Sequence, residues 1–229
     1  MKKRFQAAWL TALLLACAGT AGANPADPMA ERVQACAGCH GEEGRSAAES
    51  YAPSIAGKPA GYLYQQLLGF RDGRRKHAVM QQMLAWLSDD YLRDMAAYYG
   101  TREPAQVPRP PRATAAVLAR GRQLVEQGDA ARRLPACAAC HGDQLLGVQP
   151  AIPGLLNLRD EYLQAQLGAW RNGSRHAPAP DCMADIARRL SGEEIAAITA
   201  WIATRELPQE HRPAPRRDQP LPIDCGGVP

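Results

Sequence analysis

Apolar side chains recur at helical spacing in both halves of this 229-residue chain. Leu63, Leu67 and Phe70 lie at positions i, i+4 and i+7, which predicts a helix over 62–71 with one buried face. The same spacing recurs in the second half at Leu163, Leu167 and Trp170. We therefore expect a second helix over 162–171 that buries the corresponding face.

Two further helices are expected to begin at serine residues that suit the N-cap position. Ser88 is followed by two aspartates in the first turn, and Ser191 has Glu194 three residues on, as in a capping box. Another helix is expected over 113–127. No stretch alternates convincingly between apolar and polar residues, so the pattern predicts an all-α fold.

The chain contains an internal repeat, in which matching blocks keep the same order at an offset of 100 to 103 residues. The matched blocks are Cys36-Ala-Gly-Cys39-His40 with Cys137-Ala-Ala-Cys140-His141, Tyr62-Leu63 with Tyr162-Leu163, Gln66-Leu67 with Gln166-Leu167, and Leu87-Ser88 with Leu190-Ser191. A nearly constant offset over most of the chain indicates a duplicated domain.

The repeat and the proline-rich stretches divide the chain into five expected segments. Residues 1–23 are a signal peptide, 24–103 the first unit, 104–111 a stiff proline-rich linker, 112–206 the second unit, and 207–229 a proline-rich tail that lies over the surface.

The first 23 residues have the pattern of an export signal. Lys2, Lys3 and Arg4 give a basic start, and small residues follow an apolar run just before Asn24. Lipoprotein processing at Cys17 is an alternative that would anchor the chain to a membrane. Without this segment the formal charge falls from +4 to +1, because 24 of the 27 basic residues remain against 23 acidic ones. We therefore expect an exported, periplasmic protein with no nucleic-acid partner.

Each cysteine cluster is a Cys-x-x-Cys-His run, the spacing at which c-type haem is attached. Two thiols at this spacing reach the two vinyl groups on one porphyrin edge, and the next residue offers an imidazole to the iron. The sequence therefore predicts two covalent haems. Cys36 and Cys39 hold the first and Cys137 and Cys140 the second, while the iron ligands on the attachment side are His40 and His141.

A methionine lies seven residues before each repeated Leu-Ser pair, at Met80 and at Met183. Equivalent thioethers in the loop before the last helix of each unit are the predicted ligands on the opposite side of each iron. His77 and His176 are the rival ligands, although they match less well in position. Met83 competes in the first unit only.

Groups around the ligands also recur. Pro53-x-Ile55-x-Gly57 matches Pro150-x-Ile152-x-Gly154, and the carbonyls of Pro53 and Pro150 could accept the other ring N–H of each haem-binding histidine. A simple turn is the alternative. Four arginines are candidates for holding haem propionates, or else for solvated helix ends: Arg71, Arg75, Arg171 and Arg175.

Cys182 and Cys225 remain once the haem cysteines and Cys17 are set aside. An even pair in an exported protein permits a disulfide, which would pin the tail across the loop that carries Met183. This pair has no counterpart in the first unit.

These motifs resemble the dihaem cytochromes c of the c4 type, over nearly all of the chain after residue 23. The resemblance implies two tandem class I cytochrome c domains, each wrapped around one covalent haem, with their haems in exchange contact. It also implies a periplasmic electron carrier, soluble or loosely membrane-associated, that passes electrons toward terminal oxidases. We expect a monomer that docks transiently with its redox partner proteins.

Three other functions remain open on the sequence alone. The chain could be the dihaem subunit of a larger dehydrogenase, or a dihaem peroxidase with one open iron. A structural zinc site built from the two Cys-x-x-Cys pairs is a third alternative. Because matched ligands would close both irons, the sequence favours a carrier that is not an enzyme.

Overall fold

The computed structural model describes residues 28–47, 50–106 and 112–228. The expected signal peptide, residues 1–23, and most of the expected linker, residues 107–111, lie outside this part of the chain.

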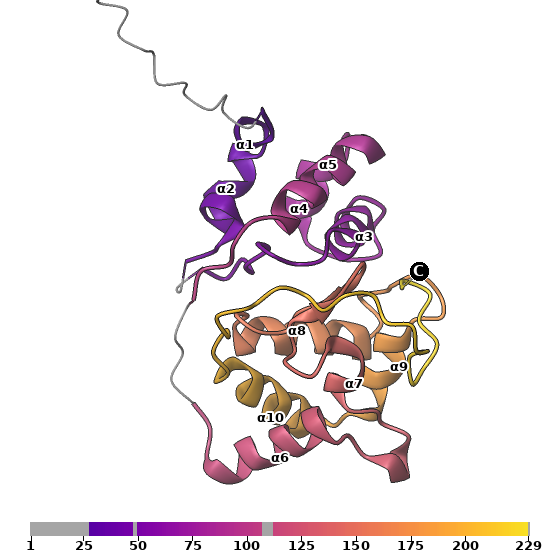
Figure 1. Ribbon diagram of the computed structural model, residues 1–229. Coiled ribbons are helices and arrows are strands. Elements are labelled where there is room, and N and C mark those ends of the chain that lie inside the picture. Colours follow the sequence, from indigo (N-terminus) through magenta and orange to yellow (C-terminus); the bar gives the residue numbers. More distant parts are fainter. Residues whose placement is uncertain (1–27, 48–49, 107–111, 229) are drawn as a thin grey trace, which may run out of the picture.

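The described residues form two helical units in chain order (Figure 1). The first unit contains α1 (Pro28–Arg32), α2 (Gln34–His40), a 3₁₀ turn (Glu42–Gly44), α3 (Ala60–Arg71), α4 (Ala78–Leu84) and α5 (Asp89–Gly100). The second contains α6 (Ala115–Glu126), a 3₁₀ turn (Ala130–Arg132), α7 (Cys137–His141), β1 (Gly147–Val148), β2 (Ile152–Pro153), α8 (Asp160–Arg171), α9 (Cys182–Arg189) and α10 (Gly192–Ala203).

The helices predicted from the periodicity are present, with two differences. The second unit carries a small antiparallel sheet in which β1 pairs with β2, so the expectation of no strand is wrong at this place. Two residues per strand are too few for an alternating pattern to show in sequence. The segments that carry the two matched methionines are short helices, α4 and α9, rather than loops.

Capping residues define where the main helices begin. Ser88 accepts a hydrogen bond from the backbone of the first turn of α5, and Ser191 does the same for α10. Glu194 completes a capping box at the start of α10. Thr114 caps α6 in the same manner. These contacts satisfy N–H groups that the helices themselves leave unpaired.

Each unit has its own apolar core. In the first, α3 packs against α5 around the fully buried Leu92. In the second, α10 packs on both α6 and α8, and the α6–α10 crossing is close because Gly121 has no side chain. A Cβ atom there would lie 2.0 Å from the carbonyl oxygen of Ala197. The two cores are separate clusters, as expected for a duplicated domain.

The two units stack on one another, with α3 facing α8 across the junction (Figure 1). The loops after these helices pair as an isolated antiparallel bridge between Arg75 and Arg175. The first unit also donates Lys58 Nζ to the carbonyl oxygens of Gly154 and Leu156, at 2.9 and 3.3 Å. The junction is therefore held by a contact between equivalent residues, Arg75 and Arg175, and by the contacts of Lys58, which the second unit does not mirror.

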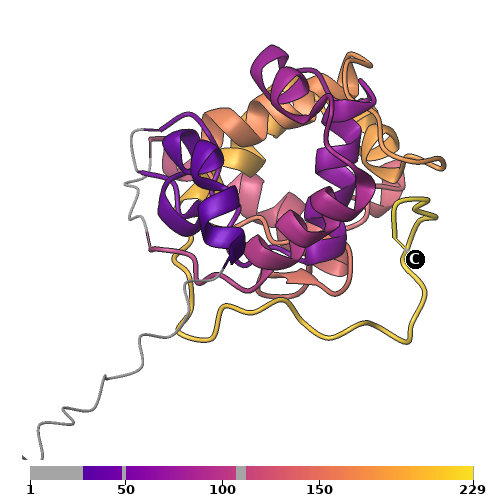
Figure 2. The same ribbon diagram turned by 90° about the horizontal axis from the view of Figure 1, so that it is seen from above.

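The tail after α10 runs along the outside of the molecule (Figures 1 and 2) and contains no helix. Ala214 makes two backbone hydrogen bonds beside β1, and His211 contacts Glu103 of the first unit at 2.5 Å. A disulfide joins Cys182 of α9 to Cys225, which fastens the end of the tail to the second unit.

Candidate functional site

A cavity of about 820 Å³ lies at the junction and extends into both units. Both Cys-x-x-Cys-His runs reach it, through Cys36, Cys39 and His40 from α2 and through Cys137, Cys140 and His141 from α7. Most of its remaining lining is apolar. The structure thus gathers every residue predicted for covalent attachment around one apolar space.

The ring of His40 is oriented by the chain itself. Its Nδ1 lies 2.9 Å from the carbonyl oxygen of Pro53. Because a carbonyl oxygen only accepts, Nδ1 carries the proton and the lone pair lies on Nε2. Burial lowers the pKa of His40, so the ring is held neutral, the form that binds iron.

His141 has the same arrangement with a different partner from the one predicted. Its Nδ1 donates to the carbonyl oxygen of Pro153 at 2.8 Å, so the assignment of Pro150 is wrong. Pro150 lies in the turn between the two short strands, and the described residues of the first unit contain no such strand pair. Pro153 lies 100 residues after Pro53, and the same offset relates Tyr62 to Tyr162. This offset was the feature of the sequence that could have identified Pro153 as the partner of His141. Burial lowers the pKa of His141 as well.

The four cysteines of the two runs lie on the first or last turns of α2 and α7, and none of them takes part in a disulfide. Each pair has i, i+3 spacing, which places both sulfurs on one helix face. Burial raises the pKa of Cys137 to about 12 and also raises the pKa of Cys36. Within the described residues no three His, Cys, Asp or Glu side chains gather in the arrangement that a structural zinc site would need.

Met80 and Met183 both line the cavity, each in the first turn of its short helix. His77 also lines it, but its Nδ1 accepts a hydrogen bond from the backbone N–H of Met80 at 3.4 Å and so caps α4. His176 is not among the lining residues. Met83 lines the cavity and is 40% exposed. Met80 and Met183 therefore occupy equivalent positions in the two units, each lining the cavity from the first turn of its helix.

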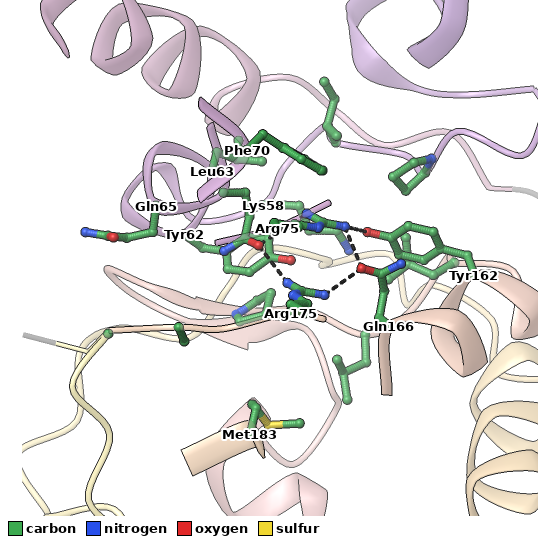
Figure 3. A pocket seen from close by; sticks show the side chains of 18 of the residues that line it. Lys58, Tyr62, Leu63, Gln65, Phe70, Arg75, Tyr162, Gln166, Arg175 and Met183 are labelled. Atoms are coloured by element: carbon green, nitrogen blue, oxygen red, sulfur yellow. Dashed lines mark hydrogen bonds between the residues drawn. The ribbon is translucent and has the colours of Figure 1, made fainter. Parts of the chain in front are cut away.

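Two of the four candidate arginines meet at the junction (Figure 3). Arg75 donates to Tyr162 Oη at 2.7 Å and to Gln166 Oε1 at 2.8 Å. Arg175 donates to the same Gln166 oxygen at 2.7 Å and to Gln66 Oε1 at 2.6 Å. Both guanidinium groups are buried, and all these partners are neutral. Gln66 and Gln166 belong to the Gln-Leu pair that repeats in the sequence, but their role as hydrogen-bond acceptors for the two arginines was not predicted.

The other two arginines lie away from the cavity. Arg71 forms ion pairs with Asp72 and Asp89 at 3.1 and 2.7 Å and donates to the carbonyl oxygen of Leu87. Arg171 is exposed. Both therefore act as solvated helix ends, the alternative that the sequence left open.

The donor set of the cavity fits a planar, apolar group that carries anions. Burial lowers the pKa of Arg175, and the neighbouring cation Arg75 lowers it further. Among the described residues, neither arginine forms an ion pair with a carboxylate. Trp170 also lines the cavity, and its Nε1–H is a buried donor that has no hydrogen-bond partner among the described residues. Haem propionates would supply the missing negative charge and acceptors, while the porphyrin would fill the apolar space.

The fold and the site together define a duplicated c-type cytochrome. Sequence comparison agrees, since the family described as Cytochrome c matches residues 30–101 and 118–206. The chain belongs to the cytochrome c family, and its function is electron transfer by two covalently bound haems. The two matched regions fall inside the two units expected from the repeat.

Similar proteins carry more specific names. A "Thiosulfate dehydrogenase electron acceptor" from Thiomonas intermedia (strain K12) is 33% identical over 90% of this chain and 93% of its own. A "Cytochrome c4" from Pseudomonas aeruginosa is 34% identical over 84% of this chain and 96% of its own. The resemblance to the c4 type is therefore confirmed.

A solved structure of a thiosulfate dehydrogenase from Marichromatium purpuratum superimposes with a TM-score of 0.67 and 39% identity. The match covers 74% of this chain but only 36% of that one, so this chain corresponds to about a third of the solved protein.

Proposed function

We propose that the protein is a periplasmic carrier that accepts electrons from a dehydrogenase and passes them one at a time through two closed haems. Cys36 and Cys39 would bind the first haem and Cys137 and Cys140 the second. His40 with Met80, and His141 with Met183, would complete the two iron coordination shells. The observation that carries this proposal is that both sets line one cavity in equivalent positions.

The haem supplies one-electron redox chemistry, and the chain determines its conditions. The carbonyls of Pro53 and Pro153 keep Nε2 of each histidine free to bind iron. Thioether ligands would raise the reduction potential and leave no open position for substrate. Arg75 and Arg175, which lie at the junction of the two units, would hold haem propionates.

A dehydrogenase is the electron donor that the similar proteins favour. Two of them are named as electron acceptors of thiosulfate dehydrogenase, and the solved thiosulfate dehydrogenase chain includes a part like this one. A thiosulfate dehydrogenase is accordingly the proposed donor, and a terminal oxidase is the expected acceptor. The proposed role therefore joins two of the functions that the sequence left open: the protein is a free carrier, and a dehydrogenase is the partner that reduces it.

A periplasmic site agrees with covalent haem and with the expected signal peptide. Among the described helices, none combines the length and the apolar character needed to cross a bilayer. We propose a monomer that docks transiently with its partners, as is usual for redox encounters.

The proposal is tested by mixing the oxidised holoprotein with a thiosulfate dehydrogenase and thiosulfate. We expect both haems to be reduced, and expect membranes that contain a terminal oxidase to reoxidise them. A protein that ascorbate reduces but the enzyme with thiosulfate does not would contradict the proposed donor.

A peroxidase would require one iron with an open position. The equivalent placement of Met80 and Met183 argues against such asymmetry. Turnover of hydrogen peroxide by the resting holoprotein, with a high-spin haem in its spectrum, would support that alternative instead.

A further inference from the structure

The helix α4 of the first unit has two apolar faces. One face is buried, because Leu84 is 2% exposed and Met80 packs against the core. The other face points to solvent and carries Val79 and Met83, which are 54% and 40% exposed, and Trp86, in the turn just after the helix, is 95% exposed. Ala85 keeps helical backbone angles, so Trp86 continues the i, i+4, i+7 spacing of Val79 and Met83, and the three residues form one stripe along α4 and the turn after it. We call this stripe the α4 face.

The α4 face is uncharged and adjoins the haem cavity. No Lys, Arg, Asp or Glu occurs from Ala78 to Ser88. Val79 and Met83 line the mouth of the cavity, so the exposed stripe leads directly to the first haem site. Charge depletion with Trp and Met enrichment is the composition of an interface core, and Trp is frequent among interface hot spots.

The second unit covers the corresponding place with its own chain. Aligning Met183 on Met80 places Cys182 where the first unit has Val79, and Cys182 is the residue disulfide-bonded to the tail. Ile186, in the position of Met83, packs against the core. Arg189, in the position of Trp86, is paired with Asp185.

The tail also closes the second site from outside. Leu221, Ile223 and Val228 line the part of the cavity near α9. Of the two equivalent faces, one is thus covered by the tail, and the other is apolar and is not covered by any part of the chain that the structure describes.

We propose that the α4 face is the docking surface for the electron-donating dehydrogenase, and that electrons therefore enter through the first haem. This inference rests on the proposed function. Three side chains are too few to bury the roughly 800 Å² per partner of a stable interface, so they do not suit a permanent dimer of this chain. They do suit a transient redox encounter that places a partner's redox centre near the first haem.

The test compares holoproteins that carry Trp86→Ala or Val117→Ser. Val117, on α6 of the second unit, is 38% exposed and lies outside the cavity lining, so it serves as the matched apolar control. The assay is reduction by a thiosulfate dehydrogenase with thiosulfate at varied cytochrome concentration. We expect Trp86→Ala to raise the KM for the cytochrome about tenfold or more, with kcat little changed. The control should behave like wild type, and ascorbate should reduce all three proteins at the same rate.

Each outcome separates the two proposals. If the dehydrogenase does not reduce the wild type, the proposed function fails and the docking assignment fails with it. If it reduces the wild type and Trp86→Ala with the same KM, only the docking surface is refuted. If sedimentation shows a wild-type dimer that Trp86→Ala separates, the face is an interface between copies of this chain and the proposal is overturned.

Discussion

The disulfide between Cys182 and Cys225 should contribute a large share of the stability of the second unit. The two residues are 43 positions apart, so the bond closes a long loop in the unfolded chain. In the chain-entropy treatment, such a loop is worth about 4 kcal/mol at 25 °C. We therefore predict that Cys182→Ser/Cys225→Ser lowers the free energy of unfolding of the second unit by about that amount.

Urea unfolding of the holoprotein, followed by far-UV circular dichroism, measures this change. With a slope of about 2 kcal/mol per molar urea, the midpoint of the second unit should fall by about 2 M. Wild type whose disulfide has been reduced and alkylated is the matched control, and its midpoint should coincide with that of the double variant. A double variant that unfolds at the wild-type midpoint would refute the reasoning, because the tail would then be held by its other contacts.

Three further predictions concern single side chains. The pKa of Glu194 is lowered to about 2 by Arg132 and by its other hydrogen bonds, so its stabilisation is present above about pH 4.5 and is lost as pH falls toward 2. Glu194→Gln should therefore cost about 1–2 kcal/mol at pH 7 and flatten acid unfolding, whereas the exposed Glu193→Gln should not. Gly121→Ala should cost about 3 kcal/mol in thermal or urea unfolding, because the new Cβ meets a carbonyl of α10 at 2.0 Å, while Gly168→Ala, whose Cβ meets nothing within 4 Å, should be neutral or stabilising. Arg175→Gln removes a buried cation at the junction, which should favour the ferric over the ferrous haem. A potentiometric titration of this variant should therefore show at least one lower reduction potential. Unchanged potentials would contradict a contact between Arg175 and a propionate.

Features that depend on residues close together in the chain could be predicted from the sequence. The capping box at Ser191 and the apolar face of α3 depend on residues a few positions apart, and the structure contains them. On α8 only Leu163 of the predicted face is buried, while Leu167 and Trp170 are half-buried and line the cavity. The pairing of Cys182 with Cys225 depended on counting cysteines rather than on geometry, and the structure contains that bond too.

Features that depend on contacts between the units could not be read from the sequence. Lys58 is a lysine in the first unit and Leu158 occupies the same place in the second, and nothing local indicates that its ammonium group reaches the carbonyl of Gly154. Burial there lowers the pKa of Lys58 to about 8. The error at Pro150 has a similar origin, because a three-residue shift around the β1–β2 turn produced a matching motif at the wrong offset.

The central claim is that both irons are closed by a histidine and a methionine, which makes the protein a relay rather than a reaction centre. The most direct measurement is the absorption spectrum of the purified holoprotein, ferric and ferrous, with and without carbon monoxide. The account predicts two covalent haems per chain, a methionine-to-ferric-iron charge-transfer band, and no spectral change when carbon monoxide is added to the ferrous protein. Ready binding of carbon monoxide to either haem would contradict it.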